Sequence, residues 1–395
     1  MSREDALAVV ETVVDKNADA LVDLRRDLHA HPELSWQEVR TTDLVSHHLD
    51  EVGFRLTRTG ESGLLAEIGD EVEGSPVVAL RADLDALPVD DSTGDPWHSQ
   101  VPGVAHACGH DVHTTSLLGA GLALAEVHAE GLLRGRVRLL FQPAEEVMPG
   151  GATRLMNFGA LDGVTRIFCL HCDPTIDVGQ VGLREGPITG AADSLEIRLT
   201  GSGGHTSRPH LTEDLTFALA KIVTELPAVL SRRLDPRAGV SVVWGHVRAG
   251  RATNVIPDSG TLAGTVRMLD SVAWSDMEHR IRQYVAEIVS PYGVAAEVDY
   301  KRGVPPVVND TASVALLERA VADVLGPGGH APTAQSLGGE DFAWYLTLVP
   351  GAMGRLGTRT PGGPTYDIHQ GNLRVDERAT VIAAKVLATV AVTAF

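Results

Sequence analysis

The run Val137-Arg138-Leu139-Leu140-Phe141 is short and apolar, and it reads as a buried strand. Two similar runs occupy residues 77–80 (VVAL) and 167–170 (IFCL), and helical patterns separate the runs from one another. Strands that alternate with helices predict a largely parallel sheet covered on both faces, which is an α/β fold in three layers. In such sheets ligands bind beyond the carboxyl ends of the strands.

Residues suited to catalysis or metal binding follow each of these runs. Asp83 and Asp85 follow the run 77–80, and Glu145 and Glu146 follow the run 137–141. His171 is expected at the end of the strand that contains 167–170. We therefore expect all of them at one edge of the sheet. A helical region over residues 6–52 precedes the first run.

From about residue 191 the pattern changes, because single apolar residues alternate with polar ones. Helices are predicted over 213–230 and 275–289, and strands over 240–247, 260–268 and 295–300. This indicates a smaller α+β domain over 189–302, inserted into a discontinuous catalytic domain formed by 1–188 plus 303–395.

Composition limits the kind of protein further. The chain of 395 residues is 44% hydrophobic and 22% charged, enough for one large or two ordinary domains. A net charge of −19 argues against a nucleic-acid partner, and no apolar stretch is long enough to span a membrane. Without a recognisable secretory signal, and with only three cysteines, a cytoplasmic location is expected.

The segment HACGHDVH (106–113) places a thiol, three imidazoles and a carboxylate around one glycine. Cys108 and His110 stand two residues apart, so both side chains can turn to one side of a tight loop. A divalent ion would hold such a thiol deprotonated at neutral pH. The segment therefore predicts part of a metal site.

Glu145 and Glu146 follow a strand and precede Pro149-Gly150-Gly151. Neighbouring side chains at a strand end point in different directions, so one carboxylate can bind metal while the other takes a proton from water. A bare Glu-Glu pair is more often a solvated acidic surface. The surrounding candidate ligands favour the catalytic interpretation.

Two histidines elsewhere need weighing against simpler explanations. His171 lies between Cys169 and Cys172, but a single Cys-x-x-Cys pair is weak evidence for a redox or structural zinc site. Cys169 is interpreted as a core residue, which leaves His171 as the better ligand candidate. His369 stands in a loop before the final helix, where a lone histidine is more often structural.

Ordered motifs along nearly the whole chain resemble one family, the co-catalytic metallopeptidases of the aminoacylase and hippurate hydrolase type. That family includes bacterial N-acyl-amino-acid amidohydrolases and plant auxin-conjugate hydrolases. The resembling segments are LHAHPELSWQE (28–38), LRADLDALPVDDSTG (80–94), HACGHDVHTT (106–115), FQPAEE (141–146), GSGGHTSRPH (201–210), NVIP (254–257), GTVR (264–267) and GGEDFAWY (338–345).

The resemblance implies two divalent metal ions per subunit, with Glu145 as the general base. Zinc or manganese suits this ligand set best, and cobalt or nickel also fits. Which ligand bridges the ions stays open. Asp83 and Asp111 are interpreted as residues that orient the ligands. The implied metal ligands are Cys108, His110, Glu146, His171 and His369.

The resemblance also assigns substrate recognition, a lid and dimerisation to the inserted domain, whose residues can complete a neighbouring active site. A histidine at the position of His205 stabilises the oxyanion in relatives, and Asn254 and Arg267 correspond to positions associated with the substrate carboxylate. Structural roles for His205 and Arg267 remain open alternatives. After His369 the chain departs from the family pattern at 370–373 (QGNL), which predicts a different pocket wall.

The expected activity is hydrolysis of the amide bond of an N-acyl-amino acid, giving a carboxylic acid and a free amino acid. A dipeptidase or carboxypeptidase on the same scaffold is the alternative enzyme, and a non-catalytic metal-binding regulator is a further one. The expected partners are a small-molecule N-acyl-amino acid and further copies of the chain, as a homodimer or higher homo-oligomer.

Overall fold

The computed structural model describes residues 3–70 and 74–395, which divide into two compact units. The described residues of unit 1 belong to Met1–Ile188, Val308–Ala334 and Trp344–Phe395, and unit 2 comprises Thr189–Val307 and Gln335–Ala343. The domain limits predicted at 188/189 and 302/303, and the lid and dimerisation roles, stay predictions.

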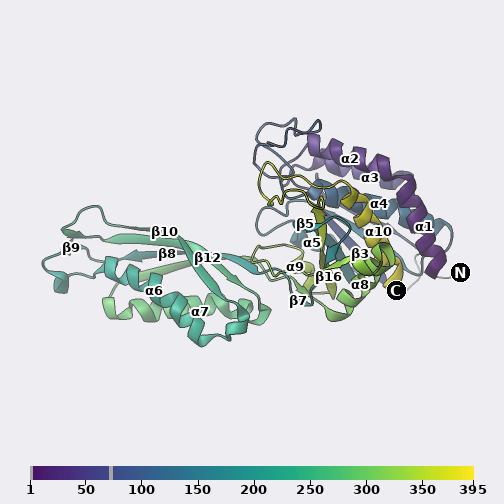
Figure 1. The fold of residues 1–395 in the computed structure, drawn as a ribbon. Coiled ribbons are helices and arrows are strands. Elements are labelled where there is room, and N and C mark those ends of the chain that lie inside the picture. Colours follow the sequence, from purple (N-terminus) through teal and green to yellow (C-terminus); the bar gives the residue numbers. More distant parts are fainter. Residues whose placement is uncertain (1–2, 71–73) are drawn as a thin grey trace. The chain divides into compact units, whose positions relative to one another are not determined.

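Unit 1 contains one large mixed sheet with helices around it (Figure 1). Its helices are α1 (Arg3–Lys16), α2 (Ala18–Ala30), α3 (Val39–Glu51), α4 (His110–Ala129), α5 (Ala152–Asn157), α8 (Thr311–Leu325) and α10 (Arg378–Thr393), and α9 (Ala343–Leu346) starts at its boundary. Its strands are β1 (Arg55–Arg58), β2 (Leu64–Ile68), β3 (Val77–Asp83), β4 (Arg136–Gln142), β5 (Val164–Asp177), β6 (Val181–Gly182), β7 (Gly186–Pro187), β14 (Val308–Asn309), β15 (His330–Ala331) and β16 (Gly351–Arg359).

The sheet has the strand order β1-β2-β4-β3-β5-β16-β6-β15 within the described residues. Its central strands β4, β3, β5 and β16 run parallel, whereas β1 and β2 join one side antiparallel and β6 pairs antiparallel with β16. The predicted α/β fold with a largely parallel sheet is confirmed. Parallel neighbours bring their carboxyl ends to one edge, and this arrangement positions the site.

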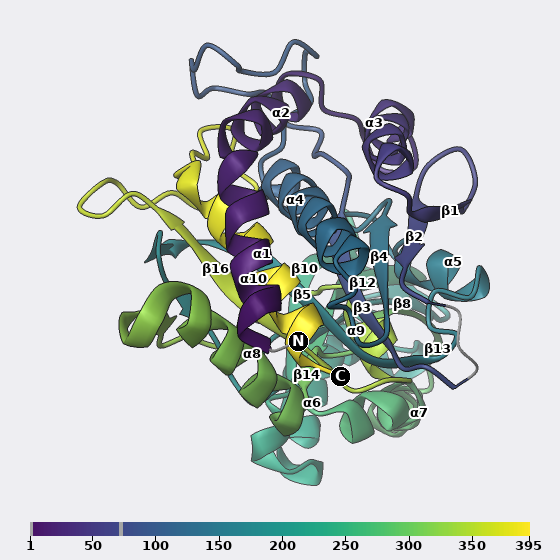
Figure 2. The same cartoon turned by 90° about the vertical axis from the view of Figure 1, so that its right-hand side faces the viewer.

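Alternation along the central strands divides their side chains between two faces. Val78, Leu80 and Ala82 of β3 pack into one hydrophobic core together with helices α1, α4, α8 and α10. Figure 2 shows α1, α4 and α10 lying side by side in that layer. The opposite face carries Arg81, and Gln142 there accepts a hydrogen bond from the Tyr345 hydroxyl of α9 at 3.0 Å.

Helix α4 is buried on almost every side, as expected for a helix covered by several neighbours. It contacts β3 as well as α1, α2 and α10, so its first turn is fixed in three dimensions. Because α4 begins at His110, this packing also fixes the second half of the segment 106–113, which is predicted to bind metal.

One sequence prediction about the site is wrong. His171 was expected at the end of a strand, but β5 continues to Asp177 and places His171 in its interior. Pairing of β5 with β3 ends at Arg81↔Cys169, whereas pairing with β16 continues through Arg355↔His171. The partner strand β16 therefore extends β5 beyond the edge where β3 stops, and His171 lies at that edge.

Unit 2 is an antiparallel sheet of order β10-β12-β8-β13 with two long helices. The strands are β8 (Ala191–Thr200), β10 (Ser241–Ala249), β12 (Ser259–Met268) and β13 (Ala295–Val304), and the helices are α6 (Leu215–Arg233) and α7 (Ser271–Val289). A short ribbon pairs β9 (Gly204–His205) with β11 (Val255–Ile256). The α+β character predicted for this region is confirmed, including both helices.

No helix in residues 3–70 and 74–395 combines the length and the apolar character needed to cross a membrane.

Candidate metal centre

Two of the predicted ligands stand where α4 begins: Cys108 lies in the preceding loop, and His110 is the first residue of the helix. Gly109 between them has φ +86°, and a Cβ built there would lie 2.8 Å from the Cys172 sulfur. A side chain at this position would be strained in its backbone and would also collide with β5. Glycine thus allows Cys108 and His110 to present their side chains on one side of the tight loop.

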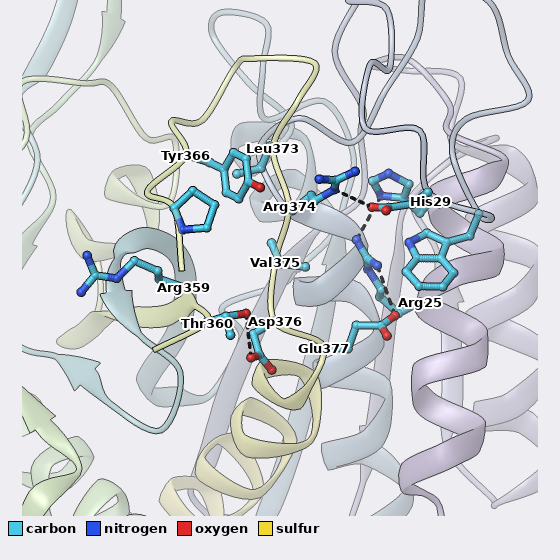
Figure 3. Close-up of a pocket in the computed structure, with 13 residues that line it drawn as sticks. Arg25, His29, Arg359, Thr360, Tyr366, Leu373, Arg374, Val375, Asp376 and Glu377 are labelled. Atoms are coloured by element: carbon cyan, nitrogen blue, oxygen red, sulfur yellow. Dashed lines mark hydrogen bonds and ion pairs between the residues drawn. The ribbon is translucent and has the colours of Figure 1, made fainter. Parts of the chain in front are cut away.

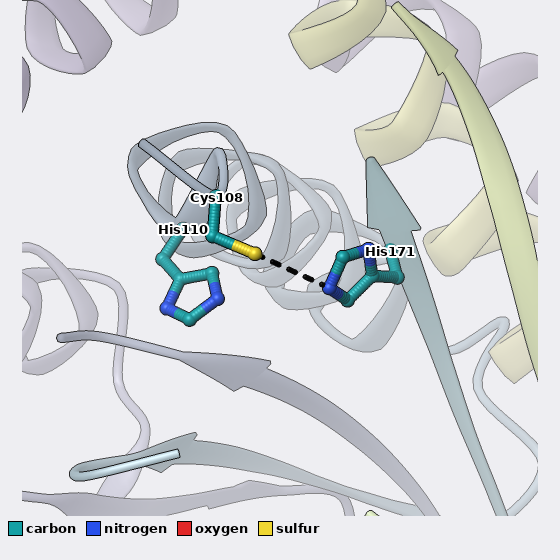
Figure 4. A group of neighbouring side chains, drawn as sticks. All are labelled: Cys108, His110 and His171. Atoms are coloured by element: carbon teal, nitrogen blue, oxygen red, sulfur yellow. Dashed lines mark hydrogen bonds between the residues drawn. The ribbon is translucent and has the colours of Figure 1, made fainter. Parts of the chain in front are cut away.

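Side chains from four separate segments meet beyond the strand ends. Cys108 Sγ lies 3.6 Å from His171 Nε2 (Figure 4). Glu146 Oε1 is 3.7 Å from His110 Nε2 and 3.3 Å from His369 Nε2. All five predicted metal ligands are therefore brought together, although they come from four segments of the chain that lie far apart in sequence.

Two of these imidazoles are held in one orientation by their second nitrogen. His110 Nδ1 donates to the carbonyl oxygen of Asp85 at 2.9 Å, and His171 Nδ1 donates to the carbonyl oxygen of Cys172 at 2.8 Å. A proton on Nδ1 leaves the lone pair on Nε2, which is the tautomer a metal ligand needs. In both rings Nε2 is the atom directed at the other candidate ligands.

Buried atoms without partners show that this donor set suits a cation. Within the described residues, His110 Nε2 is buried and makes no hydrogen bond, and the buried Glu146 Oε1 makes none beyond its ion-pair contact with His369 Nε2. Leaving such atoms unpaired costs about 1–3 kcal/mol each unless something else satisfies them. A divalent ion satisfies both, and the mixture of thiolate, imidazole and carboxylate ligands is the one that zinc and related transition metals prefer.

The Cys108 thiol has a chemistry that depends on such an ion. Burial raises the pKa of Cys108 above its usual range, and the nearby His110 only partly opposes this effect. In the protein alone the group is therefore a neutral thiol at physiological pH. Bound metal reverses this preference, since a coordinated thiol is deprotonated.

His113 and Asp83 support the ligands from behind. His113 Nδ1 donates to Asp83 Oδ1 at 2.6 Å, and His113 Nε2 accepts from the backbone N–H of Cys172 at 2.8 Å. With both ring nitrogens occupied, His113 has no lone pair for a metal. Burial by itself raises the pKa of Asp83, but His110, His113 and Arg81 outweigh it and hold the pKa well below its usual range.

Asp111 has a similar supporting place at the start of α4. Its carboxylate lies 2.8 Å from Arg25 Nε, and His29 Nδ1 donates to it at 2.8 Å. Burial alone raises the pKa of Asp111, but these two partners hold it below its usual range. Asp111 thus ties the first turn of α4 to helix α2.

Arg25 and His29 also line a cavity of about 350 Å³ bounded by the segment that follows His369 (Figure 3).

The turn after β4 directs both glutamates. The backbone N–H of Glu145 donates to Asp85 Oδ1 at 3.0 Å, and that of Glu146 donates to Asp85 Oδ2 at 2.9 Å. One carboxylate therefore holds two consecutive amides. The Glu145 carboxylate lies near Glu146 and His110, with one ligand-type atom of each within 4.8 Å of the others.

Asp85 is the residue whose contribution sequence reasoning missed. Its position after β3 predicted only that it lies at the common edge, whereas the structure uses both of its oxygens to hold the glutamate turn. A carboxylate two residues beyond a buried strand is the signal available in the sequence. Which backbone amides donate to this carboxylate depends on a turn some 60 residues later.

The three residues predicted to contact substrate belong to unit 2, where the structure brings His205 and Asn254 together and places Arg267 apart from them. His205 lies in the β9–β11 ribbon, and the carbonyl oxygen of Asn254 accepts from Thr206 N at 3.2 Å, so these two are close. Arg267 stands at the other end of β12 from Ser259, roughly 26 Å away at the usual strand rise. Arg267 Nη1 donates to the Leu337 carbonyl oxygen at 2.5 Å. Unit 2 by itself therefore does not bring Asn254 and Arg267 to one ligand.

Comparisons with known proteins give results for both sequence and structure. N-acetyl-L-cysteine deacetylase from Bacillus subtilis (strain 168) is 37% identical over 369 residues, covering 92% of this chain and 85% of the relative. A Rhodococcus jostii (strain RHA1) protein that carries the name of a glutamate–cysteine ligase is 49% identical over 368 residues, which are 93% of this chain. Those residues are 46% of that relative, so the chain spans about half of its length.

A solved structure from Bacillus subtilis, described as a dinuclear metal binding peptidase from the M20 family, matches with a TM-score of 0.83 and 34% identity. The match covers 96% of this chain and 99% of that one. The model of Peptidase family M20/M25/M40 matches residues 79–393. The resemblance drawn from the ordered motifs is confirmed: the chain belongs to Peptidase family M20/M25/M40.

Proposed function

We propose that this protein is a metal-dependent amidohydrolase that cleaves the amide bond of N-acyl-amino acids. The observation that carries the proposal is a second carboxylate, Glu145, beside a buried set of metal-ligand atoms. A protein that only binds metal has no use for a carboxylate beyond the ligands, whereas a hydrolase needs one as general base.

Five side chains would hold two divalent ions, with zinc or manganese the metals that suit them best. When bound, these ions polarise the amide carbonyl and lower the pKa of water. The five side chains that would hold the ions are those of Cys108, His110, Glu146, His171 and His369.

Glu145 takes the proton from the attacking water and returns it to the nitrogen of the leaving amine. Asp85 accepts from the backbone N–H of Glu145, so the main chain that carries the carboxylate is held in place. The reaction balances as R-CO-NH-CHR′-COO⁻ plus water giving R-COO⁻ and ⁺H₃N-CHR′-COO⁻. Asp83 and Asp111 hold the helix and the imidazoles that surround the reacting groups.

We assign to His205 the stabilisation of the oxyanion, and to Asn254 and Arg267 the recognition of the substrate carboxylate. Because Asn254 and Arg267 lie at opposite ends of unit 2, a single chain does not supply both from this unit to one carboxylate. A homodimer offers a solution, since His205 and Asn254 of one copy can complete the site of the other.

A peptidase acting on unblocked dipeptides is the second candidate, and the description of the matched family as peptidases favours it. It differs from the first candidate in requiring a free amino group on the substrate. The two activities therefore separate by substrate and not by mechanism.

The test compares turnover of N-acetyl, N-benzoyl and indole-acetyl amino acids with turnover of unblocked dipeptides, using metal-loaded protein. We expect hydrolysis of at least one N-acyl series, and a fall in kcat of about 10²- to 10⁴-fold in Glu145→Gln at unchanged metal content. Hydrolysis of dipeptides alone would favour the second candidate. Turnover by Glu145→Gln equal to that of the parent would exclude the proposed mechanism.

A further inference from the structure

The segment 33–38 (ELSWQE) belongs to a motif for which the proposed chemistry has no role. In unit 1 it lies against the end of β3. The backbone N–H of Ala86 donates to the Glu33 carbonyl oxygen at 2.8 Å, and the Ser35 hydroxyl donates to Asp85 Oδ2 at 2.7 Å. The segment therefore contacts the same aspartate that holds the glutamate turn.

Glu38 extends this contact to the glutamate turn itself. Its side chain is fully buried, and Oε1 accepts from the backbone N–H of Trp36 at 3.0 Å and from that of Ala144 at 2.7 Å. Three consecutive amides of the turn, at 144, 145 and 146, thus all donate to carboxylates. Glu38 takes the first amide, and Asp85 takes the other two.

Ala144 is a position where such an anchor has a physical purpose. It is fully buried and has φ +54°, the left-handed conformation that a residue with a Cβ adopts only at a cost of order 1 kcal/mol or more. Its carbonyl oxygen accepts from Gly151 N at 3.0 Å. Both polar groups of Ala144 are therefore held, one of them by Glu38.

Helix capping does not account for the buried carboxylate. Glu38 is the residue before α3, yet its side chain makes no capping hydrogen bond to that helix. The free amides of α3 are satisfied by Glu33, whose two carboxylate oxygens accept from Arg40 N at 2.9 Å and Thr41 N at 2.8 Å. The two glutamates of the segment thus have separate tasks.

We propose that Glu38 is a positioning residue for the hydrolase: it holds Ala144 in its left-handed conformation and thereby aims Glu145 and Glu146 at the metal centre. This inference rests on the proposed function. It adds a role for a residue that touches neither substrate nor metal and acts only through the backbone of the glutamate turn.

The experiment compares Glu38→Ala, Glu38→Gln and Glu33→Ala in the full chain. Glutamine keeps an oxygen that accepts from both amides, so Glu38→Gln should retain the parent kcat. Glu38→Ala removes that acceptor and should lower kcat by about 10- to 100-fold with little change in KM, since small displacements of catalytic groups have effects of this size. Glu33→Ala is the matched control, because it removes two hydrogen bonds from the same segment without touching the turn.

Metal affinity, measured by competition with a chromogenic chelator using zinc alone, provides a second readout. We expect Glu38→Ala to bind zinc about tenfold more weakly, since Glu146 is aimed through the same turn. Glu33→Ala should bind zinc as the parent does. Melting temperatures of all variants show how far each change affects stability alone.

The outcomes separate this inference from the proposed function. If the parent hydrolyses none of the substrates, the proposed function fails, and the zinc affinities of Glu38→Ala and Glu33→Ala still decide the role of Glu38. Equal kcat and equal zinc affinity for these two variants would overturn the inference. Failure of Glu38→Gln to retain kcat would also overturn it, because the acceptor oxygen is then not what matters.

Discussion

The sheet edge of unit 1 where the predicted ligands meet and the β9–β11 ribbon of unit 2 both carry predicted site residues, but in opposite environments. His110 and Cys108 are buried, and the ring of His110 is oriented by a hydrogen bond from its second nitrogen. His205 and Asn254 are exposed, and Nδ1 of His205 accepts from the hydroxyl of Ser207 at 2.8 Å. In the first region the protein itself fixes the orientation of the predicted ligands. In the second region the side chains face solvent, so their further contacts depend on what binds there.

This difference follows from the cost of burial. Buried polar groups are mostly paired, and in unit 1 the rings of His110 and His171 are each oriented by a hydrogen bond from Nδ1, while His110 Nε2 is left without one. Exposed side chains are paired by water and need no such network. A rigid metal centre and an adaptable recognition surface are thus consistent with the two environments.

The largest effect expected is from removing metal. Dialysis against a strong chelator should abolish turnover, and zinc or manganese should restore it. Because burial raises the pKa of Cys108, the metal-free site holds a thiol, and binding of an ion at neutral pH should release its proton. Calorimetric titration in buffers of different ionisation enthalpy measures the number of protons released.

The matched control for this experiment is the buried Cys169, which lies in the core of β5. Cys108→Ala should release about one proton fewer than the parent, and Cys169→Ala should release as many as the parent. Turnover that survives chelation, or equal proton release by both variants, would contradict the assignment of Cys108.

The next effect tests whether the exposed ribbon serves a second copy of the chain. His205→Ala should lower kcat by about 10²- to 10³-fold, the size found when one oxyanion donor is lost. If His205 completes the site of a partner, mixing His205→Ala with Glu145→Gln after dissociation and reassociation should restore about a quarter of the parent activity. Sedimentation velocity confirms that dimers have re-formed.

Two results would count against this arrangement. A protein that sediments as a monomer at assay concentration has no partner to complete its site. If the protein is a dimer but the mixed variants gain no activity, His205 either completes the site of its own chain or takes no part in the site.

The third effect concerns stability in the two environments. Asp111→Asn leaves the buried Arg25 and His29 without their shared carboxylate, and we expect the free energy of unfolding at neutral pH to fall by about 3–5 kcal/mol. Because the folded pKa of Asp111 is held low, its contribution is fully present above about pH 4 and is lost as the pH falls further. Denaturant unfolding of both proteins at about pH 7, 5 and 3 measures the difference.

The smallest effect is expected for Asp235→Asn in unit 2, where Asp235 pairs with Arg237 at 2.6 Å on the surface. Water screens the charges of an exposed pair, so its contribution to stability is small and this variant should unfold almost as the parent does. Equal losses for Asp111→Asn and Asp235→Asn, or a loss for Asp111→Asn that does not shrink in acid, would show that burial is not what separates the two regions.

Much of the fold was predictable because its periodicities are local. The apolar run at 137–141 became the interior of β4, and the helical pattern at 275–289 became most of α7. His171 was misplaced because the end of β5 is set by β16, a strand that lies far along the chain. Pairing between distant strands leaves no periodic signal in either one.

Sequence alone determined which residues are chemically able to act. The spacing of Cys108 and His110 around one glycine predicts a metal site, and the adjacency of Glu145 and Glu146 after a buried strand predicts a general base beside it. These are properties of short segments, where neighbouring residues are close in space by covalent connection.

Only the tertiary structure decided how those residues are aimed. Two amides of the glutamate turn donate to Asp85, and a third donates to Glu38. Both ring nitrogens of His113 make supporting hydrogen bonds. Asn254 and Arg267 lie at opposite ends of unit 2. Such assignments arise because buried polar groups must find partners wherever the packed chain brings them. That requirement acts between segments far apart in sequence, so it appears only once the chain has folded.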